Sequence, residues 1–187
     1  MVEPLPGERP ISPRTKARAT GAFWLVVFIA GSLALGVPRG ILWVVLNKIA
    51  ALSYVVVTIL LFDLLRPVHR TAALVALLFG LAGSVLSLSG LGPVLHVRDL
   101  VFFGAQCVIV GALIVRSTFL PRSLGVLMAV AGLGWLTFIS PPLADAVAPY
   151  NLVPGMIGEG VTLLWLLVRG VDVAKWEVEY RLMAGHP

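Results

Sequence analysis

The apolar residues of this chain come in long runs, and most charged residues stand at the ends of those runs. Each run has about twenty residues, the length that an α-helix needs to cross a hydrocarbon core about 30 Å thick. The strands of a membrane barrel would instead alternate apolar and polar residues over about ten positions. The pattern predicts an all-α, polytopic membrane protein, a bundle of six transmembrane helices. The predicted spans cover about residues 19–37, 48–65, 71–91, 100–115, 123–140 and 152–170.

The rest of the chain divides around this transmembrane domain of residues 16–170. Residues 1–15 are rich in proline and lack an apolar period, so we expect a disordered N-terminal tail. In residues 171–187, apolar side chains recur on one helical face, which predicts an amphipathic cytoplasmic tail. That face carries Val173, Trp176, Tyr180 and Met183, opposite Asp172, Lys175 and Glu179. Prolines near residue 152 leave open whether the sixth span begins as a re-entrant segment.

Composition and charge agree with this pattern. Hydrophobic residues make up 59% of the chain and charged residues only 12%, which excludes an ordinary soluble domain. The basic residues are topology signals rather than a nucleic-acid surface, because they flank apolar runs. With six spans, eleven of the fourteen fall on one face, which predicts that both termini are cytoplasmic. These eleven are Arg9, Arg14, Lys16, Arg18, Arg66, Arg70, Arg116, Arg122, Arg169, Lys175 and Arg181.

One acid, Glu159, lies inside the sixth span. It is ten residues from Arg169, or roughly 15 Å at the helical rise, near the middle of the membrane. Gln106 lies at the same depth on the fourth span, while Thr58 and Tyr54 on the second come out at roughly 12 and 18 Å. An acid at this depth is costly unless it is neutral or paired. We therefore predict an intramembrane polar cluster of Glu159, Gln106, Tyr54 and Thr58. Glu159 is expected to face the interior, to be neutral and to bond Gln106.

This cluster has two interpretations at the level of the sequence. It either locks helices together or lines a small polar cavity for a ligand or proton. Small residues in the third span, among them Ala76, Gly80, Gly83 and Ser84, predict a close helix-packing face. Asp63 lies three residues before Arg66, which predicts a surface ion pair.

The sequence contains no residue pattern that is typical of a catalytic site or of a cofactor-binding site. No nucleophile, base and orienting group can be assembled, so we expect a protein that is not an enzyme. His69 and His96 fall on opposite membrane faces and cannot share one haem iron. No carboxylate and histidine cluster has metal spacing, so neither a metal nor a cofactor is expected.

Several segments resemble one known family. FLPRSLGVLMAVAGLGWL (119–136) and GEGVTLLWLLVRGVDVAKW (158–176) look like the carboxyl-terminal half of the bacterial membrane protein family called domain of unknown function 4386. ATGAFWLVVFIAG and LLRPVHR (64–70) are similar to its first span and its second-to-third connection. The resemblance implies a six-helix, multi-pass protein of the bacterial inner (plasma) membrane, and implies no activity.

Two classes of function remain. The first is a non-enzymatic bundle that binds a lipid, a small apolar ligand or a membrane partner. The alternative is a small transporter or proton-coupled carrier that uses Glu159. Expected partners are membrane lipids, and also a second copy or another membrane protein; nucleic acid is not expected.

Overall fold

The structure is a computed structural model that describes residues 11–91 and 98–185. Within these two ranges all regular structure is helical, which confirms the all-α prediction. Residues 1–10 of the predicted disordered tail, and His96, lie outside the described residues. The helices are α1 (Pro13–Gly36), α2 (Ile41–Leu65), α3 (Arg70–Ser89), α5 (Asp99–Arg116), α6 (Arg122–Leu136), the 3-10 turn η1 (Thr137–Ile139), α7 (Pro141–Val147), α8 (Leu152–Val168) and α9 (Val173–Ala184).

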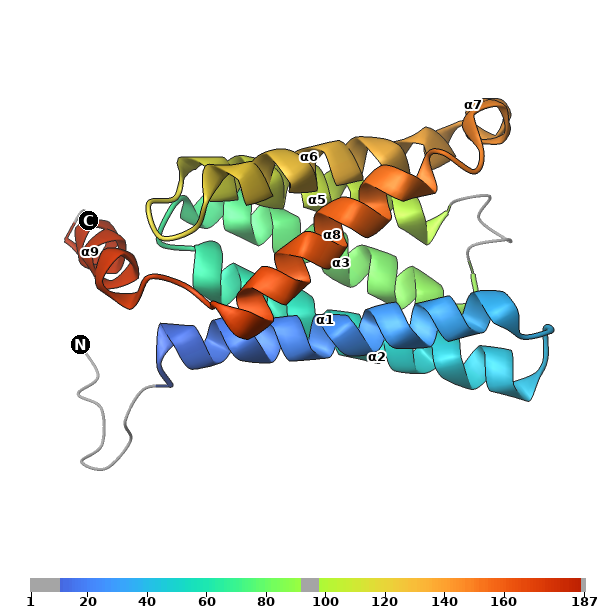
Figure 1. Ribbon diagram of the computed structural model, residues 1–187, viewed down its shortest axis with the longest axis horizontal. Helices are drawn as coiled ribbons and strands as arrows, with labels where there is room; N and C mark the ends of the chain where they lie inside the picture. Colours follow the sequence, from blue (N-terminus) through green and yellow to red (C-terminus); the bar gives the residue numbers. More distant parts are fainter. Residues whose placement is uncertain (1–10, 92–97, 186–187) are drawn as a thin grey trace.

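The long helices run back and forth along an elongated bundle (Figure 1). The α9 end of the bundle holds the start of α1, the α2–α3 and α5–α6 connections, and α9. The α7 end holds the α1–α2 turn and α7. Each long helix therefore begins at the end where the previous one stopped. The described N-terminal residues and α9 consequently lie at the same end.

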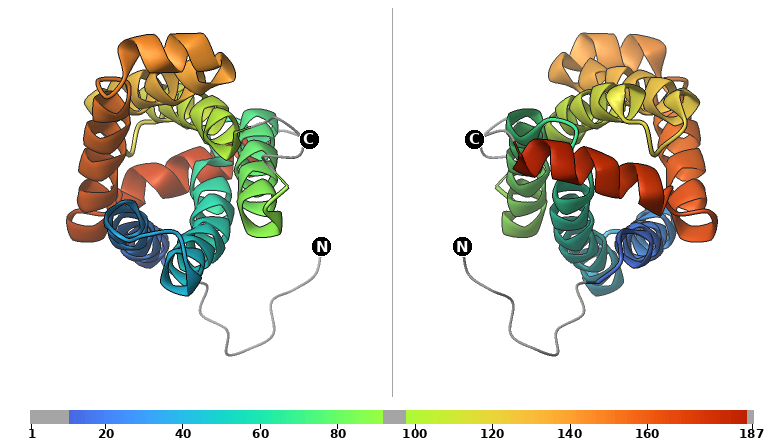
Figure 2. Two further views of the ribbon diagram at one scale, coloured as in Figure 1. Left: turned by 90° about the vertical axis from the view of Figure 1, so that its right-hand side faces the viewer. Right: turned by 90° about the vertical axis from the view of Figure 1, so that its left-hand side faces the viewer.

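Seen along its length, the bundle is a closed ring (Figure 2). α1 packs on α2, α2 on α3, α3 on α5, α5 on α6 and α6 on α8, and α8 closes the ring against α1. Side chains fill the interior, including Trp24, Val57, Val110 and Leu163, all at most 2% exposed. α9 lies across one end of the ring (Figure 2). The outward faces carry large apolar side chains, such as Leu78 and Leu133, as lipid contact requires.

The described residues contain five helices that are long and apolar enough to cross a membrane. A sixth span is completed if the bent pair α7 and α8 is counted as one, with an 81° angle between its two helices. Pro141 and Pro142 open α7, where the lack of an N–H costs nothing. α8 begins separately at Leu152 and matches the predicted sixth span, 152–170, while α7 precedes it at a sharp angle. The polytopic helical bundle predicted from the sequence is confirmed.

Two helices are longer than the predicted spans. α1 begins at Pro13, inside the segment 1–15 that we expected to be disordered, because Ser12 caps it by accepting the Thr15 N–H at 3.2 Å. α2 begins at Ile41, whereas the predicted span began at residue 48. The apolar residues before Lys48 extend this helix beyond one core thickness. The position of a charged residue therefore does not mark where this helix begins.

Small residues set the closest helix contacts. The α3 face predicted for packing is buried at Ala76, Gly80, Gly83 and Ser84. The tightest pair is α5 with α6, which approach through two pairs of glycines. A Cβ on Gly111 would lie 2.6 Å from the Gly125 carbonyl oxygen, and a Cβ on Gly132 would lie 2.6 Å from the Gly104 carbonyl oxygen. This backbone-to-backbone contact fixes how far each helix is rotated about its axis.

Candidate functional site

Glu159 faces the interior of the ring, as predicted. The buried face of α8 follows a three-to-four residue spacing and includes Gly155, Gly158, Glu159, Thr162 and Leu166. Glu159 is 7% exposed. The small residues on this face let α8 approach α6 closely, since a Cβ on Gly158 would lie 2.9 Å from the Ala131 Cβ. The same close contact carries the carboxylate of Glu159 into the ring.

Three side chains donate hydrogen bonds to Glu159. The Trp24 indole Nε1–H of α1 donates to Oε2 at 3.1 Å. The Trp135 indole Nε1–H of α6 donates to Oε1. The Cys107 thiol of α5 also donates to Oε1, at a sulfur–oxygen distance of 3.8 Å, as a weak bond. The carboxylate thus joins four helices, and both of its oxygens are occupied.

No basic partner completes this site in the part of the chain that the structure describes. None of the ion pairs among residues 11–91 and 98–185 includes Glu159. Indole and thiol donors stabilise a carboxylate without introducing an opposite charge. The arrangement can hold a carboxyl group in the middle of the bundle, and it fixes the orientation of two tryptophan rings.

The predicted bond between Glu159 and Gln106 is wrong. The Gln106 amide Nε2 donates instead to the Thr58 hydroxyl oxygen at 2.6 Å, and both residues are 1% exposed. Gln106 Oε1 is buried and has no hydrogen-bond partner among the described residues. The physical reason is helix rotation: Gln106 and Cys107 are neighbours on α5, about 100° apart around its axis. The α5–α6 glycine contacts turn Cys107, and not Gln106, towards Glu159.

Tyr54, also predicted for the cluster, lies against aromatic rings of α1 and α5. Its ring meets Trp24 edge-on at 6.4 Å between centroids and lies 4.6 Å from the Phe103 ring. It is therefore beside the Glu159 group, while Thr58 and Gln106 form a separate pair one turn away. A void beside Thr58 and Gln106 is too small to hold a water molecule. This pair therefore serves helix packing between α2 and α5.

Sequence reasoning missed three functional contacts: Trp24, Trp135 and Cys107. Cys107 lies nine residues before Arg116, at nearly the same depth as Glu159, so the depth argument admitted it as readily as Gln106. The tryptophans carry no comparable signal, because a long indole reaches a partner well above or below its own Cα. A buried indole N–H needs a hydrogen-bond acceptor, and Glu159 is an acceptor inside the bundle. This requirement is the signal that could have paired the tryptophans with Glu159.

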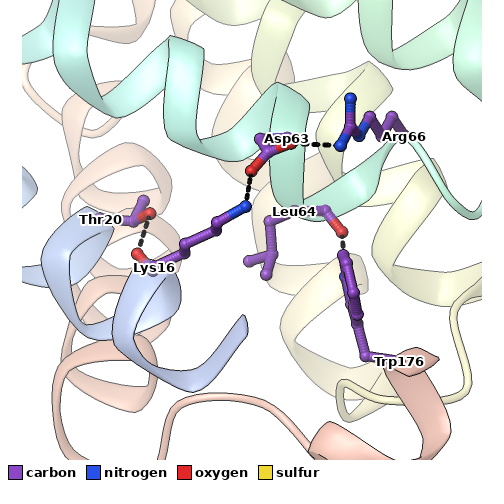
Figure 3. Close-up of polar contacts among 6 residues, drawn as sticks. All are labelled: Lys16, Thr20, Asp63, Leu64, Arg66 and Trp176. Atoms are coloured by element: carbon purple, nitrogen blue, oxygen red, sulfur yellow. Dashed lines mark hydrogen bonds and ion pairs between the residues drawn. The ribbon is translucent and has the colours of Figure 1, made fainter. Parts of the chain in front are cut away.

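At the α9 end, α9 docks on the bundle through polar contacts (Figure 3). The Trp176 indole N–H donates to the Leu64 carbonyl oxygen at 2.8 Å. That carbonyl belongs to the last turn of α2 and has no partner within its own helix. Asp63 forms the predicted ion pair with Arg66 at 2.9 Å, and also binds Lys16 of α1 (Figure 3). Arg66 in turn lies over the Tyr180 ring, 5.7 Å from its centroid.

The amphipathic pattern placed Glu179 on the polar, solvent-facing side of α9. In the structure its carboxylate instead contacts the rest of the protein. Its Oε1 accepts the backbone N–H of Thr118 at 2.7 Å. Its Oε2 is buried and has no hydrogen-bond partner in the described chain. The carboxylate therefore ties α9 to the segment that follows α5.

A cavity of about 290 Å³ lies beside this contact, and we call it the α9-end groove. Its apolar lining consists of Pro67 and Val68 from the α2–α3 turn and Leu182 and Met183 from α9. Its polar lining consists of His69, Arg116 and Glu179. The groove is thus amphiphilic, and it lies where the helices end.

Comparison with known proteins places the chain among uncharacterised relatives. Residues 96–170 match the family Domain of unknown function (DUF4386). An "Uncharacterized protein" of Archaeoglobus fulgidus is 28% identical over 132 residues, which cover 65% of this chain and 79% of the relative. No solved structure matches. The match supports the resemblance found in the sequence over residues 96–170, which include three of the four helices that meet at Glu159.

Proposed function

We propose that this multi-pass helical membrane protein, which carries the DUF4386 family region over residues 96–170, is a non-enzymatic bundle that binds an amphiphilic lipid in the α9-end groove. The observation that carries the proposal is the groove's lining. Apolar Leu182 and Met183 lie in the same cavity as Arg116 and His69. A molecule with both a charged and an apolar part matches such a surface better than a purely polar metabolite does.

The position of the groove supports a lipid as the ligand. The groove lies at the ends of α2 and α5, beside α9, where the apolar helix surfaces give way to charged residues. Headgroups of a bilayer occupy this level. Basic residues concentrated at a membrane surface attract the phosphate groups of lipids. The α9 end carries Arg14, Lys16, Arg18, Arg66, Arg70, Arg116, Arg122, Arg169, Lys175 and Arg181.

The same charges support an orientation. We place the α9 end at the cytoplasmic face of the inner (plasma) membrane of a bacterial cell, since short cytoplasmic segments are enriched in lysine and arginine. The α7 end carries few basic residues, such as Arg39 and Arg98. Both termini are then cytoplasmic, and the groove opens to the inner leaflet.

In this proposal Glu159 is a lock within the bundle. Its two oxygens already accept bonds from Trp24, Trp135 and Cys107, which favours packing over ligand binding. A transporter would use Glu159 as a proton site, and its flux would depend on pH. In proteoliposomes, a pH-driven flux that Glu159→Gln abolishes would favour the transporter and argue against the lock.

Lipid retention tests the proposed function. The full chain is released from membranes into mild detergent, and the lipids that stay bound are counted by native mass spectrometry. Met183→Trp fills the groove and should lower retention. Val178→Trp is the matched control, because Val178 is on α9, is 57% exposed and does not line the groove. Equal retention by both variants and the unmodified protein would overturn the proposal.

A further inference from the structure

The α9-end groove holds opposite charges that do not neutralise each other. Arg116 and Glu179 both line it, yet no ion pair joins them among the described residues. A cavity with a separated cation and anion presents two different binding surfaces. Its best ligand carries both a negative and a positive group, each facing its opposite.

Glu179 provides a hydrogen-bond acceptor whose position is fixed by a backbone hydrogen bond. The Thr118 N–H bonds Oε1 and fixes the carboxylate, while Oε2 is buried and has no donor in the described chain. A buried polar atom without a partner is uncommon and costs free energy, so such an atom calls for a missing donor. Because the acceptor belongs to a carboxylate, a cationic N–H group makes the strongest bond to it.

His69 provides a hydrogen-bond donor whose position is fixed by the cap of α3. Its Nδ1 accepts the backbone N–H of Ala72 at 3.1 Å, as the cap of α3. A neutral imidazole whose Nδ1 accepts must carry its proton on Nε2. His69 therefore lines the groove with a donor, alongside the Arg116 guanidinium. Both suit a phosphate, which accepts several hydrogen bonds.

We propose that the groove binds the headgroup of a phospholipid that carries both a phosphate and a primary ammonium. Arg116 and His69 contact the phosphate, and Glu179 Oε2, which turns from its buried position towards the groove, accepts from the ammonium. Leu182 and Met183 border the glycerol, and the acyl chains lie in the bilayer. A volume of about 290 Å³ is at the lower end of ligand pockets, roughly 300–1,000 Å³, and suits a headgroup rather than a whole lipid.

The chemistry separates this headgroup from the two nearest alternatives. A phosphoglycerol headgroup has no cation, so Glu179 would face an anionic ligand. A phosphocholine headgroup has a cation without N–H bonds, so Glu179 Oε2 would stay without a donor. This inference rests on the proposed function, since it names the class of lipid for the same groove.

The test is competition among three lipids with identical acyl chains: phosphatidylethanolamine, phosphatidylcholine and phosphatidylglycerol. The unmodified full chain, equilibrated with an equimolar mixture, should retain phosphatidylethanolamine about fivefold over the others, as one partly exposed charge pair allows. Glu179→Gln keeps an oxygen for Thr118 and should lose this preference. Arg116→Gln should lower retention of all three lipids.

Matched controls use charges on the same elements or at the same end. Glu177→Gln changes an acid of α9 that is paired with Arg181 at 3.9 Å and does not line the groove. Arg122→Gln changes an exposed arginine at the start of α6. Both controls should keep the preference. Should Glu179→Gln unfold, free phosphoethanolamine should still displace lipid from the unmodified protein better than glycerol phosphate does.

The outcomes separate the two proposals. Equal retention of the three lipids, still lowered by Met183→Trp, would overturn the headgroup inference and leave the lipid-binding function standing. A preference for phosphatidylethanolamine that Glu179→Gln and Glu177→Gln leave unchanged would also overturn the inference. Retention unaffected by Met183→Trp would overturn the proposed function itself.

Discussion

At the scale of the residue, Glu159 is unusual because an acid in the middle of a membrane bundle is bonded by indoles and a thiol rather than by a basic residue. The two indole N–H groups are themselves buried or half-buried, and each needs an acceptor. Acid and donors therefore satisfy one another. Losing the acid leaves donors without partners, and losing one donor leaves the acid with fewer bonds.

A double-mutant cycle measures this mutual dependence. Trp24→Phe loses packing at a fully buried position, both in the unmodified protein and in a Glu159→Leu background. In the unmodified protein it should lower the free energy of unfolding by about 1 kcal/mol more than in the Glu159→Leu background, because only the unmodified protein also loses a hydrogen bond. Unfolding in a denaturing detergent, followed by circular dichroism, gives the four values. Trp165→Phe is the control, because Trp165 does not bond Glu159 and its effect should be additive with Glu159→Leu. Additive effects for Trp24 would contradict the lock.

The Gln106–Thr58 pair depends on a glycine of the neighbouring helix. A Cβ on Gly80 would lie 2.5 Å from Gln106 Oε1 and would also meet the Thr58 hydroxyl. Gly80→Ala should therefore destabilise the bundle by about 1–3 kcal/mol through overpacking. Gly31→Ala is the control: nothing lies within 4 Å of a Cβ there, so it should be neutral or stabilising by about 0.5–1 kcal/mol. Equal effects at the two positions would refute the close contact.

At the scale of the element, α9 is docked on the bundle rather than lying free in the interface. Its attachment uses one indole donor, one carboxylate acceptor and the backbone bond from Asp172 N–H to the Phe119 carbonyl oxygen at 3.2 Å. The Leu64 carbonyl lies in the last turn of α2, while Thr118 and Phe119 belong to the connection between α5 and α6. The C-terminal end of a helix leaves carbonyl groups unpaired, and α9 pairs one of them.

Trp176→Phe tests this docking. The substitution keeps a ring that can stack on Tyr180, 5.0 Å away, but it removes the donor to the Leu64 carbonyl. The cost should be about 1 kcal/mol, felt locally as faster amide hydrogen exchange throughout α9. Val178→Ala on the exposed side of α9 should leave exchange nearly unchanged. Unaltered exchange in Trp176→Phe would show that this bond does not hold α9.

At the scale of the whole molecule, the long helices run back and forth between the α9 end and the α7 end. We therefore expect the two ends to lie on opposite sides of the membrane. Single cysteines at Gly185 and at Tyr150, which is 77% exposed, report on them. In intact cells, a membrane-impermeant thiol reagent should label Tyr150→Cys from outside and Gly185→Cys only after the membrane is opened. Native Cys107, 1% exposed, should stay unlabelled and serves as the internal control. Labelling of both sites from one side would contradict a crossing of the membrane by α8, the long helix between them.

The sequence by itself determined the class of the protein and the approximate spans, and it predicts a depth for Glu159. These features are local: in lipid each helix must satisfy its own backbone hydrogen bonds, so about twenty apolar residues suffice to specify a span. Depth follows from counting residues along one helix. The Asp63–Arg66 pair could be predicted for the same reason, since its partners lie one turn apart.

Only the tertiary structure decided which side chains meet. Gln106 and Cys107 have nearly equal depth, and the rotation of α5 against the α6 glycines chose between them. Trp24 reaches Glu159 because α8 closes the ring against α1, 135 residues away in sequence. The α9-end groove likewise needs the α2–α3 turn, the end of α5 and α9 together. Helix rotation and ring closure depend on packing between distant segments, and no local pattern of apolar and polar residues encodes them.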